Sequence, residues 1–173
     1  MQRLVGLFLI GILFTACGYK PATHYTRDVL GERIHVDVSI DRKDPKNSVL
    51  IKDAVNEGVI TRLGGKLSSK ETSDSEIYIS IGSITFTPIL YNAKGYVTSY
   101  KTKVTLKIRY KNKNGNKDNF STTGEYDFPI AEDKYGKTNS TISDSNRFQA
   151  IRYASLDALN EFISRLTIEG MNK

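Results

Sequence analysis

The feature that most constrains the fold is a two-residue alternation between residues 101 and 113. Lysine and arginine side chains there alternate with apolar ones at Val104, Leu106, Ile108 and Tyr110. Because successive side chains of a β-strand point to opposite faces, this pattern predicts a long strand over 96–113 with one buried face. Asn114-Gly115 is typical of a hairpin turn, and residues 119–130 alternate again. The sequence therefore predicts a long antiparallel hairpin.

Two further segments alternate in the same way. Residues 33–40 place isoleucine and valine on one face, which predicts a half-buried strand. Residues 77–90 predict another strand, whose apolar phase changes at Gly82-Ser83 and so indicates a β-bulge. Pro88 predicts an edge position or a strand end, because proline cannot donate to a sheet ladder.

Two segments carry apolar residues at helical spacing instead. They are residues 47–63, which end at Gly64-Gly65, and residues 145–166. Residues 66–75 and 131–144 are polar and predict loops. The expected fold is therefore α+β, a two-layer sandwich in the order β-α-β-β-β-α. Its two helices pack on one face of a four-stranded, mostly antiparallel sheet.

The first sixteen residues have the composition of a secretory signal peptide. A positively charged start precedes an apolar run at 4–14, and small residues follow. This run is too short to cross a bilayer, which needs about 20 apolar residues. A buried N-terminal helix is the alternative, although no polar side chain interrupts the run.

A cysteine follows directly. Phe14-Thr15-Ala16-Cys17 resembles the bacterial lipobox, with phenylalanine in place of the usual leucine. The resemblance implies that Cys17 begins the mature chain and carries acyl chains such as palmitate as a membrane anchor. It also implies the outer membrane, because Gly18 replaces the aspartate that commonly retains lipoproteins in the inner membrane. A free cysteine at the end of the signal peptide is the alternative.

The expected organisation is then a signal peptide at 1–16, a lipidated N-terminus and flexible tether at 17–32, and a single domain at 33–170. No catalytic motif stands out. Gly64-Gly65-Lys66 lacks the other positions of a phosphate-binding loop. One cysteine and two histidines are too few for a typical structural zinc site. The sequence predicts a protein that is not an enzyme and needs no metal or cofactor beyond its covalent lipid.

Six cations share the exposed face of the strand at 96–113, and they are the candidate binding residues. They are Lys101, Lys103, Lys107, Arg109, Lys111 and Lys113. They form either a solvated face that discourages strand pairing or a platform about 40 Å long for a polyanion. A signal peptide removes nucleic acid as a partner. The expected anion is the phosphorylated glycolipid of a Gram-negative outer membrane, with its acyl chains beside Tyr96 and Tyr100.

The lipobox, the mature start Cys17-Gly18-Tyr19 and the element order together resemble the lipopolysaccharide-assembly lipoprotein family, LptE, over residues 14–170. The resemblance implies a periplasm-facing outer-membrane lipoprotein inside an LptD-type β-barrel. There it would act as plug, assembly factor and lipopolysaccharide-binding subunit of the translocon. The main alternative is an accessory lipoprotein of another envelope assembly, such as a secretion pilotin or a cell-wall enzyme activator. A periplasmic hydrolase would need a catalytic group that the sequence does not offer.

Overall fold

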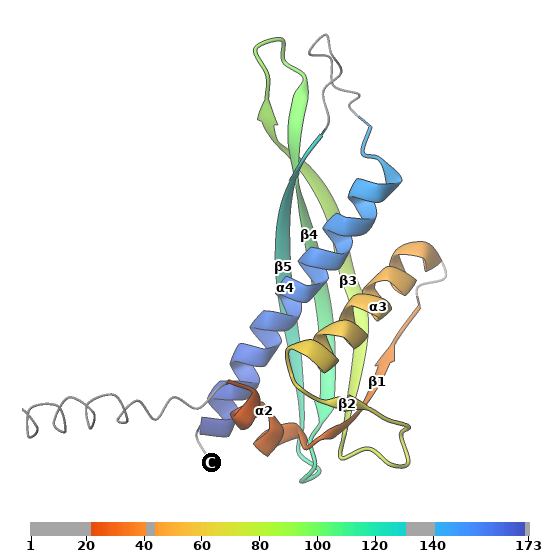
Figure 1. Ribbon diagram of the computed structural model, residues 1–173, viewed down its shortest axis with the longest axis vertical. Coiled ribbons are helices and arrows are strands. Elements are labelled where there is room, and N and C mark those ends of the chain that lie inside the picture. The colour runs from red at the N-terminus through yellow and green to blue at the C-terminus, as the bar shows by residue number, and fades with distance from the viewer. Residues whose placement is uncertain (1–21, 41–43, 131–140, 172–173) are drawn as a thin grey trace, which may run out of the picture.

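The computed structural model describes residues 22–40, 44–130 and 141–171. It contains one mixed sheet with its two longer helices side by side on the same face (Figure 1). The elements are α2 (Ala22–Leu30), β1 (Arg33–Val38), α3 (Pro45–Thr61), β2 (Lys66–Leu67), β3 (Ser75–Tyr91), β4 (Val97–Lys111), β5 (Lys117–Pro129) and α4 (Asp144–Met171).

The strand order is β2-β1-β3-β4-β5. The predicted hairpin is confirmed, because β4 pairs antiparallel with β5 from Ser99↔Pro129 to Lys111↔Lys117. β3 also pairs antiparallel with β4, and the predicted bulge is present as a register shift between Ile81 and Ser83. β1 runs parallel to both of its neighbours. The sheet is therefore antiparallel on one side of β3 and parallel on the other.

The expected count of four strands and two helices is wrong, since the described chain has five strands and three helices. The fifth strand, β2, is only two residues long and lies in the segment that we expected to be a polar loop. Two residues cannot show an alternation, so no sequence signal reveals it. β2 forms only because Lys66 and Leu67 align with Arg33 and Ile34 of β1.

The third helix, α2, occupies part of the segment expected to be a flexible tether. Val29 and Leu30 at its end are buried in the core, and α2 packs against the C-terminal part of α4. A side chain at Gly170 of α4 would come within 2.6 Å of the Tyr25 carbonyl oxygen. A nine-residue helix is marginal in isolation, so its stability depends on this tertiary packing.

The predicted helix at 47–63 begins earlier than expected. Asp44 is its N-cap and accepts a hydrogen bond from the Asn47 N–H, while Pro45 occupies the first turn. Proline favours the first turn of a helix, where its missing N–H costs nothing, so the helix can start before residue 47. The buried stripe of α3 is as predicted, and it faces the core with that of α4.

The core lies between the helices and the even-numbered face of β4. Val104, Leu106, Ile108 and Tyr110 are all buried there. Phe162 of α4 is fully buried and packs edge-on against Tyr110, with 5.9 Å between the ring centroids. None of the described helices packs on the opposite face of the sheet (Figure 1).

Helix α4 approaches β5 unusually closely. A Cβ atom at Gly124 would lie 2.0 Å from the Ala154 carbonyl oxygen and 2.2 Å from the Ala158 nitrogen. On either side of Gly124, carboxylates of α4 accept backbone N–H groups of the strand edge, Glu161 from Thr123 at 2.9 Å and Asp157 from Glu125 at 3.0 Å. The Thr123 N–H and the Arg165 guanidinium hold the pKa of Glu161 below its ordinary value.

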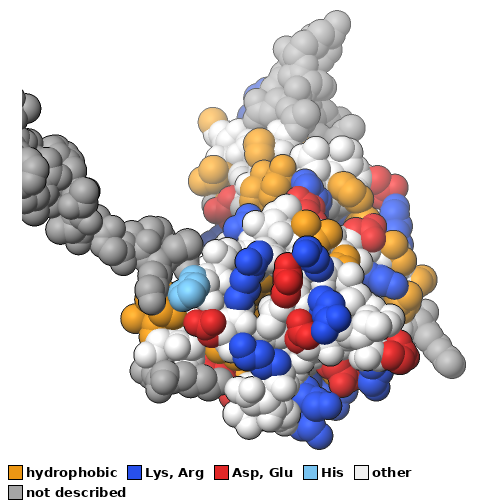
Figure 2. All heavy atoms as spheres, turned by 60° about the horizontal axis from the view of Figure 1, so that its bottom comes forward, with side chains coloured by type: hydrophobic (Ala, Val, Ile, Leu, Met, Phe, Trp, Pro, Cys, Tyr) orange, Lys and Arg blue, Asp and Glu red, His pale blue; other side chains and the backbone are white. Residues whose placement is uncertain are grey.

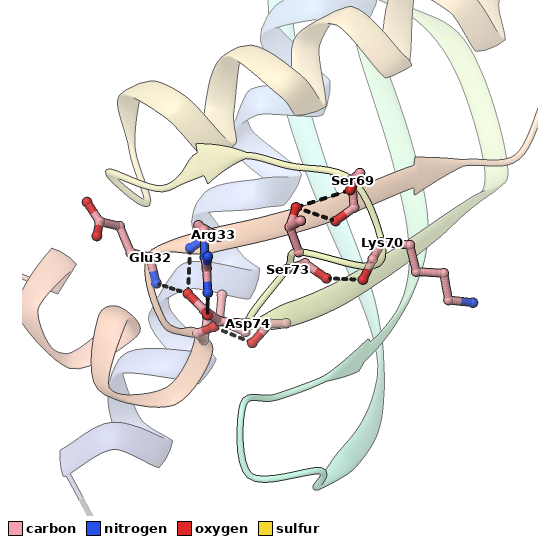
Figure 3. Close-up of polar contacts among 9 residues, drawn as sticks. Glu32, Arg33, Ser69, Lys70, Ser73 and Asp74 are labelled. Atoms are coloured by element: carbon pink, nitrogen blue, oxygen red, sulfur yellow. Dashed lines mark hydrogen bonds and ion pairs between the residues drawn. The ribbon is translucent and has the colours of Figure 1, made fainter.

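A single carboxylate fixes the start of β1. Asp74, which precedes β3, accepts the backbone N–H groups of Glu32 and Arg33 at 3.1 and 2.8 Å, and the Arg33 guanidinium lies 2.9 Å from its other oxygen (Figure 3). The hydrogen bonds from Arg33 lower the pKa of Asp74 to about 2. Gly31 beside it has φ +81°, and a Cβ there would lie 2.5 Å from the Asp74 Cβ.

We expect Gly124→Ala to destabilise the protein by about 3 kcal/mol or more, because the new methyl group meets backbone atoms that cannot rotate away. Chemical denaturation of the purified protein measures the change. Ser121→Ala, at an exposed position of the same strand, is the control and should stay within about 0.5 kcal/mol of the parent. Equal stability of the two variants would contradict the close packing.

We expect Asp74→Asn to lose stability in a pH-dependent manner. The pKa of Asp74 is lowered from 3.8 to about 2 by folding, so its contribution is complete above about pH 4 and is lost as the pH falls toward about 2. The melting temperature of the parent should therefore exceed that of Asp74→Asn near neutral pH, and the difference should shrink in acid. A difference that stays constant from about pH 6 to pH 2 would contradict this role.

Candidate functional site

The structure places five of the six predicted cations on the outward face of β4, away from the helices. They are Lys101, Lys103, Lys107, Arg109 and Lys111, which we call the basic face. Lys113 is exposed but lies beyond the strand, in the turn that joins β4 to β5. Figure 2 shows basic and acidic side chains intermingled across the lower end of the molecule.

Carboxylates on neighbouring strands neutralise both ends of the basic face. Glu125 of β5 lies 2.8 Å from the Lys101 ammonium and 3.5 Å from that of Lys103. These contacts lower the pKa of Glu125, the hydrogen bond from Lys101 contributing most. At the other end, Glu76 of β3 lies 3.4 Å from the Lys111 ammonium. Carboxylates of β5 and β3 therefore offset part of the charge of the basic face.

The two central cations are different. Within the residues that the structure describes, no carboxylate lies within 4.0 Å of Lys107 or Arg109. The sheet register explains this, because Lys107 stands between Ser80 and Ser121, and Arg109 stands between Tyr78 and Asn119. The neighbours across the sheet are thus neutral side chains, three of them short and polar, which leaves both cations available to an external anion.

Because the side chains beside Lys107 and Arg109 are mostly short, the surface around these two long side chains contains depressions. Three adjoining depressions of about 580, 470 and 240 Å³ all include Arg109 in their lining, and we call them together the Arg109 hollow. Its charged lining consists of five cations and three carboxylates: Lys70, Lys107, Arg109, Lys111, Lys117, Glu76, Asp118 and Asp37. The hollow therefore has an excess of positive charge.

Lys70 reaches the hollow from the turn between β2 and β3. The Ser73 hydroxyl donates to the Lys70 carbonyl oxygen at 2.9 Å, and the Ser69 and Thr72 hydroxyls are 3.1 Å apart (Figure 3). The turn is thus held by its own hydroxyl groups, and the Lys70 ammonium lies 3.6 Å from Glu76. Glu76 also accepts the Tyr78 hydroxyl at 2.5 Å, and this hydrogen bond contributes most to lowering its pKa.

The chemistry available at the hollow is recognition of an anion. A guanidinium binds phosphate or carboxylate oxygens in pairs, and ammonium groups add charge without fixed geometry. Serine hydroxyls and the Asn119 amide can donate further hydrogen bonds. Over the described residues, no group of three or more His, Cys, Asp or Glu side chains could hold a metal ion.

The sequence located the cations but not the hollow. Ser80, Ser121 and Asn119 carry no signal of their own, and only the register across three strands brings them beside Lys107 and Arg109. The ring of Tyr100, which we expect beside an acyl chain, stacks on buried Phe128, with 6.1 Å between the ring centroids, on the helix side of the sheet rather than beside the basic face. Tyr96 lies at the hairpin tip and is 39% exposed.

Cys17, the predicted lipid attachment site, lies outside the described residues. Of the helices that the structure does describe, none combines the length and the apolar composition needed to cross a bilayer.

Comparison with known proteins places this fold. It is similar to a lipoprotein from Caulobacter crescentus CB15, with a TM-score of 0.52 and 11% identity over 88% of this chain and 97% of that chain. It is also similar to rare lipoprotein B from Shewanella oneidensis, with a TM-score of 0.50 and 9% identity over 82% and 98%. No curated protein matches the sequence.

Structural similarity at such low identity shows the fold but not the family. A family model assigns the family. The model described as LptE, lipopolysaccharide-assembly, matches residues 33–166. This match spans every strand of the sheet together with α3 and most of α4. Because it covers well over half of the 173 residues, the chain belongs to the LptE family of lipopolysaccharide-assembly lipoproteins.

Proposed function

We propose that this LptE-family protein binds the phosphate groups of lipopolysaccharide at the Arg109 hollow, as a lipid-anchored subunit of the outer-membrane translocon. The observation that carries the proposal is the pair Lys107 and Arg109, which stand in a polar depression without a carboxylate partner in the described chain. The outer cations of the basic face, by contrast, each lie within 4.0 Å of a carboxylate.

The hollow suits a phosphorylated sugar better than an acyl chain. Most of its lining residues carry charged or polar side chains, and Phe120, Ile108 and Ile79 add apolar surface. Phosphate presents several acceptor oxygens, which match the donors of Arg109, Lys107 and the flanking serine hydroxyls. We therefore assign the headgroup, rather than the acyl chains, to this site, and no covalent step is involved.

The proposed partner is an LptD-type outer-membrane β-barrel, which the protein would plug and help to assemble. Family membership supports this partner. The proposed anchor at Cys17 is compatible with the fold, because α2 begins five residues later, at Ala22. Five residues span at most about 18 Å, so an acylated Cys17 would hold the α2 end of the domain close to the membrane surface.

We expect Lys107→Ala with Arg109→Ala to reduce lipopolysaccharide binding at least about tenfold, since charge-assisted hydrogen bonds contribute about 1.5–3 kcal/mol each. The matched control is Lys101→Ala with Lys103→Ala, which removes the same charge from the same strand but at carboxylate-paired positions. Binding to the purified full-length protein in detergent is the measurement, with melting temperature as a check on folding.

The control variant should bind within about threefold of the parent, because its cations already have protein partners. Dephosphorylated lipopolysaccharide should bind the parent as weakly as the intact glycolipid binds the Lys107/Arg109 variant. An equal loss in both double variants would show that only net charge matters, and the basic face would then be a solvated surface without a defined site.

We expect the tagged full-length protein, purified from detergent-solubilised outer membranes, to carry metabolically incorporated palmitate and to bring with it a barrel identifiable by mass as LptD-type. Cys17→Ala should lose the label, because the thiol is the proposed attachment point. Label retained in that variant would overturn the anchor. A different envelope assembly in the eluate would favour the pilotin or enzyme-activator alternative.

A further inference from the structure

The outer edge of β5 and the uncovered edge of β3 differ in whether their backbone donors have partners. At the β5 edge, backbone donors are occupied by carboxylates: Asn119 donates to Asp118 at 2.7 Å, Thr123 to Glu161 and Glu125 to Asp157. On the other side, β1 pairs with β3 only from Ser75 to Ile79. Among the described residues, the rest of β3 is therefore bordered by β4 alone, as Figure 1 also shows for its upper part.

The alternation of an antiparallel ladder identifies which groups of β3 face this open edge. Thr123 and Glu125 direct their N–H groups away from β4, so their β4 partners Thr105 and Lys103 direct theirs toward β3. These two pair with Ser83 and Thr85. The residues in between, Ile84 and Phe86, therefore direct their N–H and C=O groups outward.

The side chains beside this edge define what could pair with it. Residues 82–91 carry no charge, and Ile84 and Phe86 are half-buried against the core on the helix side. The Arg147 guanidinium of α4 lies 4.8 Å from the centre of the Phe86 ring, and no carboxylate in the described chain lies within 4.0 Å of it. The edge thus offers backbone hydrogen bonds, an apolar flank and one available cation.

We propose that the β3 edge at residues 82–87 pairs with an extended segment of the barrel partner, which adds a strand to the sheet. The segment has apolar side chains on its helix-facing side and a carboxylate that reaches Arg147. A second copy of this chain is a poorer occupant, because its own β3 edge brings no carboxylate and adds a second Arg147. The proposal rests on the proposed function for the identity of the partner.

Amide hydrogen exchange at single-residue resolution tests the pairing directly. The full-length protein in detergent is compared with its purified barrel complex. We expect exchange at Ile84 and Phe86 to be fast in the free protein and at least about tenfold slower in the complex, since pairing occupies both donors. Ser83 and Thr85, which donate to β4, are internal controls and should be protected in both samples.

A proline variant tests the same edge by another route. Ile84→Pro removes an outward donor without removing a β3–β4 hydrogen bond, so it should lower recovery of the barrel complex at least tenfold while the protein keeps a cooperative melting transition. Asp127→Pro, at an outward position of the β5 edge and outside the Arg109 hollow, is the matched control and should leave recovery unchanged. Phe86→Pro provides a second substitution if Ile84→Pro fails to fold.

The outcomes separate the two proposals. A barrel complex in which Ile84 and Phe86 still exchange rapidly overturns the strand pairing and leaves the proposed function standing. Protection that rises with protein concentration in the absence of the barrel identifies a second copy as the occupant and overturns the pairing with the barrel. Failure to recover any barrel overturns the proposed function, and the proposed occupant of this edge with it.

Discussion

The fold depends on one close contact, that of the α4 backbone with the backbone of β5 at Gly124. Any side chain there would push the helix away from the strand. At this short distance, Asp157 and Glu161 reach the strand edge, and Phe162 reaches Tyr110 and Phe120 in the core. The absence of a side chain at Gly124 therefore allows α4 to pack closely and allows its carboxylates to accept the backbone N–H groups of the β5 edge.

Because both long helices lie on one face, the other face is left to polar side chains. Most of the charged side chains there form ion pairs with residues of a neighbouring strand rather than of their own strand. Glu125 forms ion pairs with the lysines at one end of β4. At the other end, Glu76 forms ion pairs with Lys111 and Lys70 and accepts a hydrogen bond from Tyr78. The unbalanced row in the middle arises because serine, asparagine and tyrosine occupy the positions opposite Lys107 and Arg109. The availability of these two cations thus follows from the neutral side chains beside them.

Periodic segments of sufficient length could be predicted from the sequence. The hairpin of β4 and β5, the bulge in β3, and the buried stripes of α3 and α4 all extend over enough residues to show their period. β2 is too short to show any period, and α2 shows an amphipathic pattern over only nine residues beside Pro21. The sequence does not predict the start of α3 at Pro45, because Asp-Pro can end a strand as well as begin a helix.

The candidate site is harder to predict from the sequence than the fold is. The sequence places cations on a face, but whether a cation is paired depends on register, which is set by turns and by the bulge between Ile81 and Ser83. A shift of one residue in β5 would move Glu125 to the other face and remove the partner of Lys101 and Lys103. The distinction between paired and available cations therefore belongs to the assembled sheet.

The closure of the β5 edge also sets an order of events in biosynthesis. The carboxylates that accept the N–H groups of Thr123 and Glu125 belong to α4, the last of the described elements, and lie more than 30 residues downstream of the residues they contact. A nascent polypeptide can complete all five strands while its newest edge still presents free donors. Such an exposed edge is a template for misassembly between chains. The interval before α4 docks is therefore the period of greatest aggregation risk for this protein.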